Sequence, residues 1–161
     1  MRKGRVTATH NVVFFQFQGW QPGYFCLNQK KKIMSNVKIP NGHQAVIPYL
    51  MLDGAARFKE FTVKVFDGTI STTHYQEDAP EMIKHSEVSI SGSVIMFCDA
   101  RPEWPAQPAN LFVYVENADV SYEKALQAGG TSIMPPADQE YGRSCGVSDP
   151  CGNTWWITSV L

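Results

Sequence analysis

The sequence lacks a strong net charge, metal-binding cysteine spacings and a long uninterrupted apolar run. Its 161 residues include 14 Lys and Arg against 15 Asp and Glu, for a formal net charge of -1. Electrostatics therefore give no reason to expect nucleic acid or an anionic membrane as the main partner. The 4 cysteines have neither CxxC spacing nor a zinc-type CxxC/HxxxH pairing, so we expect reduced thiols in the cytoplasm. A neutral small molecule or another protein is the expected partner.

The N-terminal stretch differs in character from the rest of the chain. Its apolar run "VVFF" is followed by Gln16, Gln18 and Gln21, and it is too short and too polar for a signal peptide or a membrane span. A second methionine, Met34, stands just before the first organised segment. We expect residues 1–38 to be an extension, either disordered or the result of a mis-called start, with Met34 as the true start.

Residues 39–161 are predicted to form one domain that contains an internal repeat. The chain is 43% apolar and 18% charged, which is the make-up of one ordinary globular domain. "QAVIPYLMLDGAARFKEFTVKVF" and "ANLFVYVENADVSYEKALQAGG" each begin with a short apolar strand, continue through an acidic residue and run into a helix. The two segments match with an offset of 63, which pairs Leu52 with Val115.

Each helix is followed by three β-rich runs, so the predicted order is βαβββ, twice. The last runs, "GSVIMFCD" and "GNTWWITSV", match with an offset of 60, which pairs Gly92 with Gly152 and Met96 with Trp156. We therefore predict modules over residues 44–100 and 109–161, joined by a proline-rich linker over residues 101–108.

Strand alternation assigns a face to each side chain. Leu111, Val113 and Val115 are predicted to pack under a helix, and their neighbours to face away. Trp155 is likewise predicted on the helix side and Trp156 on the opposite side. The opposite face collects aromatic, Met and polar groups, which is typical of a ligand cavity.

The tandem order, with "PYLMLDGAARFKEF" near the start and "DPCGNTWWI" at the end, resembles the glyoxalase, bleomycin-resistance and extradiol-dioxygenase superfamily, also called vicinal oxygen chelate. Within it, the chain is similar to the PhnB-like, glyoxalase-type branch. The resemblance covers about residues 43–160. It implies an α+β fold in which the two modules form an open, curved eight-stranded mixed sheet, with helices on the convex face and the site on the concave face.

Metal-dependent members of that superfamily hold a divalent ion with His or Gln from the first strand of a module and Glu from the last. The matching positions here are on or near Ile47, Asn110, Met96 and Trp156. A thioether and an indole do not bind a hard ion. We therefore predict no conventional metal centre and no cofactor, with a divalent metal as the alternative.

His85 and Glu87 are the candidate catalytic pair, because they stand two apart on one strand of the cavity face. The glutamate would orient the imidazole as a general base, or the two would simply hydrogen-bond. His43 and His74 show no partners in the sequence and are expected to be solvated.

A second group of residues is predicted to bind the ligand. Arg143 belongs to a polar loop, "PPADQEYGRSCG", expected at the cavity mouth, where it either contacts an anionic ligand or braces the loop against Asp149. Cys145 matches His85 under the offset of 60 and is a candidate cavity thiol. The aromatic members form a ligand wall or pack in a dimer interface. The predicted ligand-binding residues are Tyr49, Met96, Asn110, Phe112, Tyr114, Tyr141, Arg143 and Trp156.

The leading hypothesis is a cytoplasmic, homodimeric member of the superfamily that binds a small molecule without a conventional metal centre, and either sequesters it or acts on it by general base. One alternative is a metal-dependent lyase, isomerase or dioxygenase with ligands around His85 and Glu87. Another is a non-enzymatic dimer whose aromatic face is buried without a ligand. Whether the protein is an enzyme stays open at this point.

Overall fold

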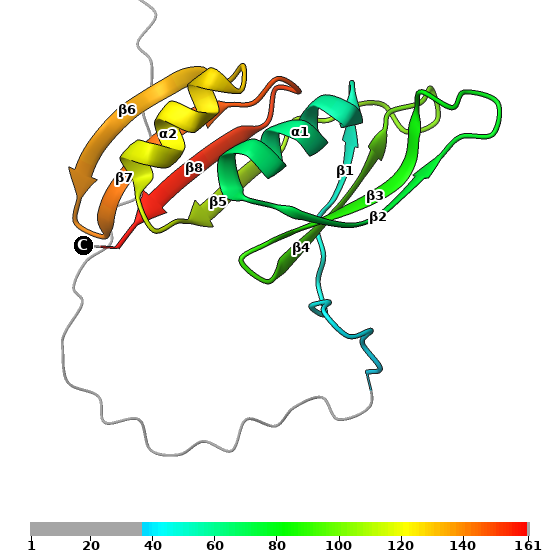
Figure 1. The fold of residues 1–161 in the computed structure, drawn as a ribbon, viewed down its shortest axis with the longest axis horizontal. Coiled ribbons are helices and arrows are strands. Elements are labelled where there is room, and N and C mark those ends of the chain that lie inside the picture. The colour runs from blue at the N-terminus through cyan, green and yellow to red at the C-terminus, as the bar shows by residue number, and fades with distance from the viewer. Residues whose placement is uncertain (1–36, 161) are drawn as a thin grey trace, which may run out of the picture. The chain divides into compact units, whose positions relative to one another are not determined.

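The computed structural model describes residues 37–160, so the expected extension over residues 1–38 lies almost wholly outside the described residues. From Lys38 onward the chain forms one compact unit, which contains the order βαβββ twice (Figure 1). The first module consists of β1 (Tyr49–Leu52), α1 (Ala55–Phe66), β2 (Thr69–Tyr75), β3 (Ile83–Ile90) and β4 (Ser93–Asp99). The second consists of β5 (Asn110–Tyr114), α2 (Ala118–Gln127), β6 (Thr131–Gln139), β7 (Gly142–Ser148) and β8 (Thr154–Ser159).

The strands form two four-stranded mixed sheets, one in each module. Sheet 1 has the order β1-β4-β3-β2 and sheet 2 the order β5-β8-β7-β6. In both sheets the first strand of the module pairs in parallel with the last, and the other pairs are antiparallel. The predicted α+β class and tandem modules are confirmed, although the eight strands are hydrogen-bonded as two open sheets rather than one.

The repeat offset of 60 is visible in the turns that lead into β4 and β8. Gly92 and Gly152 occupy equivalent places and have φ angles of 82° and 84°. Residues with a Cβ rarely adopt this left-handed conformation, whereas glycine adopts it at little steric cost. Each turn therefore depends on its glycine to deliver the last strand of the module beside the first.

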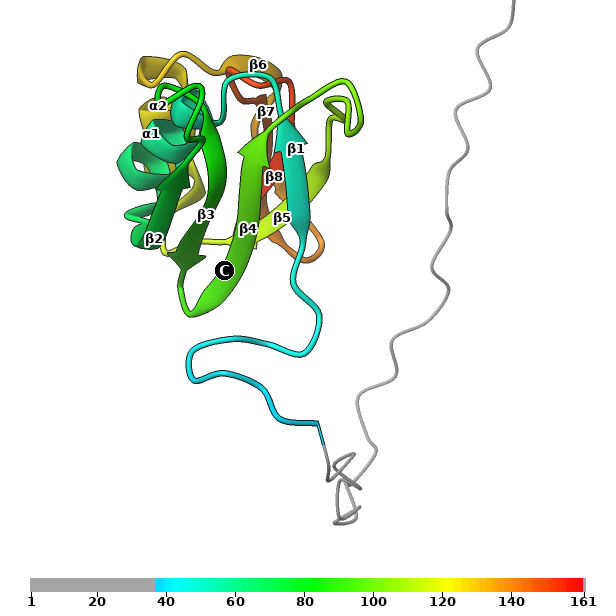
Figure 2. The ribbon, with the colours of Figure 1, turned by 90° about the vertical axis from the view of Figure 1, so that its right-hand side faces the viewer.

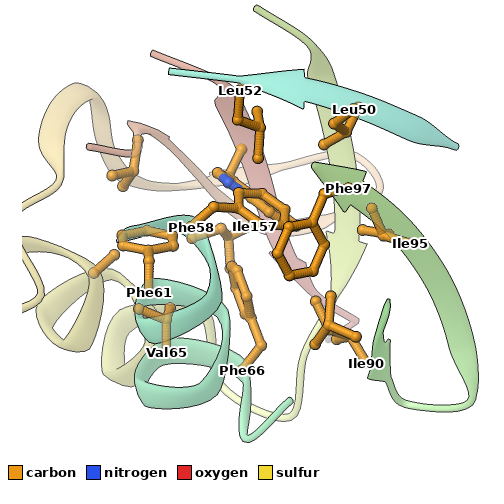
Figure 3. Close-up of a cluster of buried hydrophobic side chains, with 14 of the residues drawn as sticks. Leu50, Leu52, Phe58, Phe61, Val65, Phe66, Ile90, Ile95, Phe97 and Ile157 are labelled. Atoms are coloured by element: carbon orange, nitrogen blue, oxygen red, sulfur yellow. The ribbon is translucent and has the colours of Figure 1, made fainter. Parts of the chain in front are cut away.

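Helix α1 packs against both sheets and ties the modules together. Phe58 of α1 contacts Phe97 of β4 at a ring-centroid distance of 5.0 Å and Trp155 of β8 at 6.1 Å. Phe66, at the end of the helix, lies 4.6 Å from the same indole. Figure 3 shows the phenylalanines of α1 in one cluster with Phe97 and Ile157. The predicted helix-facing side chains thus form a single shared core.

The two helices pack next to each other, as Figure 2 shows from the side.

Helix α2 begins at an N-cap, Asn117, whose side-chain oxygen accepts a hydrogen bond from the Val120 N–H at 3.0 Å, as expected of asparagine at this position. Neither helix in residues 37–160 is long and apolar enough to cross a membrane.

The segment predicted as a polar loop at the cavity mouth is mostly strand. β6 continues through Pro135 and Pro136 to Gln139, and β7 starts at Gly142. Proline cannot donate to a β-ladder, but β6 is an edge strand and its register shifts between Met134 and Ala137. An edge with an irregularity accepts proline, so only residues 140–141 form the turn.

Candidate functional site

Each sheet has one face packed on the helices and one turned away from them, which we call the open face. In sheet 1, one row of side chains crosses the open face in the order Tyr49, Met96, Glu87 and Thr72. The equivalent row in sheet 2 is Phe112, Trp156, Gly146 and Met134. Strand alternation therefore places the predicted residues of β1, β3, β4, β5 and β8 on the open faces, as expected. Asn110 also lies there, exposed at the start of β5.

The open face of sheet 1 carries a carboxylate held between two imidazoles. His85 Nε2 lies 3.2 Å from Glu87 Oε1, and His43 Nε2 lies 3.2 Å from Glu87 Oε2. Ser71 Oγ donates a second hydrogen bond to this carboxylate, at Glu87 Oε2, over 3.0 Å. The structure thus brings His85 and Glu87 together as predicted and adds His43, which the sequence interpretation treated as solvated.

His43 reaches this carboxylate from a turn that precedes β1. Its N–H donates to Pro40 O at 3.2 Å, and the neighbouring Gln44 is tied to β4. The Gln44 amide donates to Val94 O at 2.6 Å and accepts from Val94 N at 3.1 Å. The side chain thus makes the same pair of hydrogen bonds to the Val94 backbone that a residue of a neighbouring strand would make. No sequence signal pairs this turn with β3, because the pairing depends on contacts about 50 residues apart.

The hydrogen bonds to Glu87 favour its ionised form. Burial alone would raise the pKa of this carboxyl, but hydrogen bonds from His85 and Ser71, together with the His43 imidazole, lower it below its ordinary value. The carboxylate is therefore a stable anion at neutral pH, and its side chain is only 13% exposed. Such an anion orients the imidazoles that contact it.

Tyr49 extends this chain of polar groups across β4. Its hydroxyl lies 3.4 Å from His85 Nδ1, and the two rings meet edge to face with centroids 5.7 Å apart. Desolvation, with a contribution from the neighbouring Cys98 thiol, raises the pKa of Tyr49. The hydroxyl therefore stays protonated and acts as a donor at neutral pH. Cys98 is a buried member of the open face that sequence interpretation did not single out.

His74 lies beside the chain but outside it. Its ring stands 6.5 Å from that of His85 and is tilted by only 25°. Its Nε2 contacts Thr72 Oγ1 at 3.2 Å instead of Glu87. His74 therefore flanks the candidate catalytic pair without joining it, and it provides a natural control position.

The open face of sheet 2 is aromatic where that of sheet 1 is polar. Gly146 takes the row position that Glu87 takes in sheet 1, and a Cβ there would lie 2.8 Å from Trp156 Cζ3. The indole of Trp156 therefore lies directly over the glycine. Phe112 and Tyr114 stand beside it with ring centroids 5.1 Å apart, and they are 52% and 61% exposed. Their exposure leaves an apolar surface available to a partner.

Trp155 points the other way and is anchored by the turn before β8. Its Nε1 donates to Asp149 Oδ2 at 3.0 Å. The same carboxylate accepts from the Asn153 backbone and side-chain N–H groups at 3.0 and 2.9 Å and from Cys151 N at 2.8 Å. The segment "SDPCGNTWW" is thus a buried hydrogen-bonded turn that presents one indole to the core and the next to the open face.

Arg143 does not lie on the open face, contrary to expectation. Alternation along β7 puts it on the helix side, where its guanidinium donates to Asp119 of α2 at 2.7 Å and to Asp138 at 2.9 Å. Hydrogen bonds to the Asp119 and Asp138 carboxylates raise the pKa of Arg143. Asp149, the alternative partner expected for Arg143, instead accepts hydrogen bonds from Asn153 and Trp155. Tyr141 lies in the β6–β7 turn, and its side chain is exposed.

Cys145 is not a cavity thiol. It pairs in register with Ile157 on the helix side and is fully buried, with its Sγ 3.8 Å from Ala118 O. Burial raises the pKa of this thiol to about 11. The structural counterpart of Cys145 is Ser86, which pairs with Phe97, so the offset of 60 that holds for β8 is off by one in β7.

Two hollows of about 380 and 370 Å³ lie along β5, at the seam between the modules. The smaller is lined mainly by apolar side chains of β3, β4 and β5, and Phe112 and Tyr114 stand at its rim. His85, Glu87 and Trp156 line neither hollow. Tyr49, Phe112 and Tyr114 of the open faces are 45%, 52% and 61% exposed.

The positions that hold a metal ion in metal-dependent relatives do not fit one here. Met96 lies between Tyr49 and Glu87, and Trp156 covers Gly146, so neither strand end offers an oxygen or imidazole. Within residues 37–160, no group of three or more His, Cys, Asp or Glu side chains is arranged to hold a metal ion. We therefore derive no step through a metal.

Comparison with known proteins agrees with this architecture. Residues 46–157 match the model of the Glyoxalase/Bleomycin resistance protein/Dioxygenase superfamily. The chain belongs to this superfamily. An uncharacterised protein of Mycobacterium bovis is 28% identical over 127 residues, which cover 71% of this chain and 82% of that protein.

Solved structures with the superfamily fold also superpose on the chain. TioX from Micromonospora sp. ML1 is 20% identical, with a TM-score of 0.60, over 73% of this chain and 99% of that one. TnmS3, an antibiotic binding protein from Streptomyces sp. CB03234, is 17% identical, with a TM-score of 0.57, over 74% and 100%. A PhnB protein from Bacillus cereus is 19% identical, with a TM-score of 0.57, over 73% and 100%. At these identities the likeness concerns the fold.

Proposed function

We propose that this superfamily member binds a small, flat, largely apolar molecule on the open faces of its sheets and needs no conventional metal centre to do so. The observation that carries the proposal is the aromatic surface of Phe112, Tyr114 and Trp156. Aromatic rings prefer offset-stacked or edge-to-face partners, and here two of them are more than half exposed. A flat ligand, or a second copy of the chain, satisfies that preference.

The second open face supplies the polar part of the proposed site. Tyr49 is 45% exposed, and the His85–Glu87 pair lies beside it. A few placed hydrogen-bonding groups among apolar walls are typical of small-molecule sites. The description of TnmS3 as an antibiotic binding protein supports ligand binding as a function that this fold performs.

We further propose that the protein works as a cytoplasmic homodimer. β5 pairs with β8 on one side, and no described strand covers its other edge. β1, its counterpart, has Gln107 N bonded to Met51 O at 3.2 Å along its outer edge. An uncovered edge that carries exposed aromatic residues is a surface that proteins generally cover. Light scattering coupled to size-exclusion chromatography tests this, and a monomer at micromolar concentration would refute it.

Ligand binding is tested by thermal-shift screening of the full chain against flat aromatic compounds and antibiotics, because a ligand of the native state raises Tm. Trp156→Ala removes the stacking surface and is expected to abolish the shifts. Val63→Ala, an exposed position on α1 that lines neither hollow, is the control and should keep them. A dimer without any shift would support the non-enzymatic alternative, in which the aromatic faces only pack together.

The metal question has its own test. Elemental analysis of protein purified without chelator should show substoichiometric Ni, Zn, Fe and Mn. A stoichiometric ion lost in Glu87→Gln would overturn the metal-independent proposal and support the metal-dependent alternative around His85 and Glu87.

A further inference from the structure

The hydrogen bonds around Glu87 determine which nitrogen of His85 is free. A carboxylate only accepts hydrogen bonds, so His85 Nε2, which is hydrogen-bonded to Glu87 Oε1 at 3.2 Å, must carry hydrogen. In its neutral form, His85 therefore presents the lone pair of Nδ1. The Tyr49 hydroxyl stands 3.4 Å from that nitrogen, beyond the usual range for a hydrogen bond of this kind. A closer donor can replace it.

We propose that His85 Nδ1 accepts the proton of a weakly acidic aromatic hydroxyl group, so that the ligand of this face is a phenol. This inference rests on the proposed binding of a flat molecule and names its chemical class. The acceptor atom is His85 Nδ1, and Tyr49, Glu87 and His43 are the polar groups around it. Met96, half-buried in the same row, offers a thioether that packs well against an aromatic ring.

The charge of the site selects a phenol over other hydroxyl compounds. Glu87 is an anion, and it repels a carboxylic acid, which is ionised at neutral pH. An aliphatic alcohol is too weak an acid to give its proton to an imidazole. A phenol is neutral when it arrives and is acidic enough to share or transfer its proton to an imidazole nitrogen.

The proton transfer balances within the site. The O–H bond of the phenol breaks and an N–H bond forms at His85 Nδ1, which leaves a phenolate beside an imidazolium. Glu87 stabilises the imidazolium through Nε2–H. The Tyr49 hydroxyl, which lies 3.4 Å from Nδ1, donates to the phenolate oxygen, and its raised pKa keeps it protonated for that role.

His43 acts as a positioning residue through Glu87. Its Nε2 lies 3.2 Å from the second carboxylate oxygen, and its Nδ1 is buried without a partner among the described residues. Gln44 fixes the turn that carries it. Loss of His43 should shift the pH dependence of phenol binding more than its strength at one pH. Among residues 37–160, the other titratable or charged groups that face Tyr49, His85 or Glu87 are His74, Cys98 and Arg101.

The test compares 4-nitrophenol with 4-nitroanisole, which has the same ring but no hydroxyl proton. Calorimetry with the full chain should show 4-nitrophenol binding about ten-fold more tightly or better, the gain expected from a hydrogen bond to a charged group. Bound 4-nitrophenol should show phenolate absorbance at a pH where the free compound is mostly phenol. Equal affinities would overturn the inference and leave the proposed function standing, whereas failure of both to bind would count against both.

Variants locate the effect. His85→Gln and Glu87→Gln should lose the phenolate absorbance and the preference for the phenol, while His74→Gln, on the same face but bonded to Thr72, should keep both. Long-range ¹H–¹⁵N spectra of the imidazoles test the acceptor without a ligand. They should show His85 as the Nε2–H tautomer at neutral pH, and an Nδ1–H tautomer at His85 would refute the inference.

Discussion

Replacing Asp149 with alanine should cost this protein a large part of its stability. The carboxylate is 5% exposed and accepts hydrogen bonds from Trp155 Nε1 and from the backbone and side-chain N–H groups of Asn153. Trp155 and Asn153 are themselves 1% and 0% exposed. Alanine would leave these three donors buried without an acceptor.

The magnitude follows from those contacts. A hydrogen bond to a charged group contributes about 1.5–3 kcal/mol, and a buried unsatisfied donor costs a similar amount. Water entering the vacated space recovers part of that loss. We expect Asp149→Ala to lower the free energy of unfolding by about 3–5 kcal/mol, which for a domain of this size moves the urea midpoint by about 2 M.

Urea titration followed by tryptophan fluorescence measures this shift directly. Asp138→Ala is the control, because Asp138 is 68% exposed and Arg143 keeps its partner Asp119. That variant should stay within about 0.5 kcal/mol of the wild type. An Asp149→Ala protein within about 1 kcal/mol of the wild type would refute the assignment of the carboxylate as the anchor of the tryptophan turn.

Three further predictions concern other parts of the site. Gly146→Ala should displace the Trp156 indole, because its Cβ would lie 2.8 Å from the ring, and thermal shifts by aromatic ligands should vanish; retained shifts would refute this. Glu87 has a lowered pKa, so its stabilisation is present above its ordinary pKa of about 4.5 and is lost as the pH falls through the folded value. When the pH is lowered below about 4.5, the free energy of unfolding of Glu87→Gln, measured by urea titration, should therefore fall less than that of the wild type. Identical pH profiles for the two proteins would contradict this. Burial raises the pKa of Cys145 and of Cys151 to about 11, so in a variant without the other two cysteines neither thiol should react with Ellman's reagent at pH 8 until the protein unfolds.

The repeated module and its strand faces could be predicted because both are properties of local pattern. Alternation has a period of two, so "LFVY" and "TWWIT" assigned Leu111 and Trp155 to the core and Phe112 and Trp156 to the opposite face. The structure agrees at these positions.

Local pattern was wrong where a strand ran through residues that normally break one. The polar segment "PPADQEYGRSCG" suggested a loop around Arg143, but β6 and β7 run through most of it, and alternation then places the guanidinium against α2. The offset of 60 also failed by one residue in β7, which moved Cys145 from the open face to the core. Small shifts of this kind reverse the face of every residue that follows.

By itself, the sequence determined the paired modules, the composition of each face and the position of Trp156 on the open face. Only the tertiary structure decided which polar groups meet. His43 contacts Glu87 because Gln44 bonds to β4 about 50 residues away, and Tyr49 reaches His85 by crossing a strand between them. Such contacts depend on how the backbone brings distant segments together, and no local periodicity encodes them.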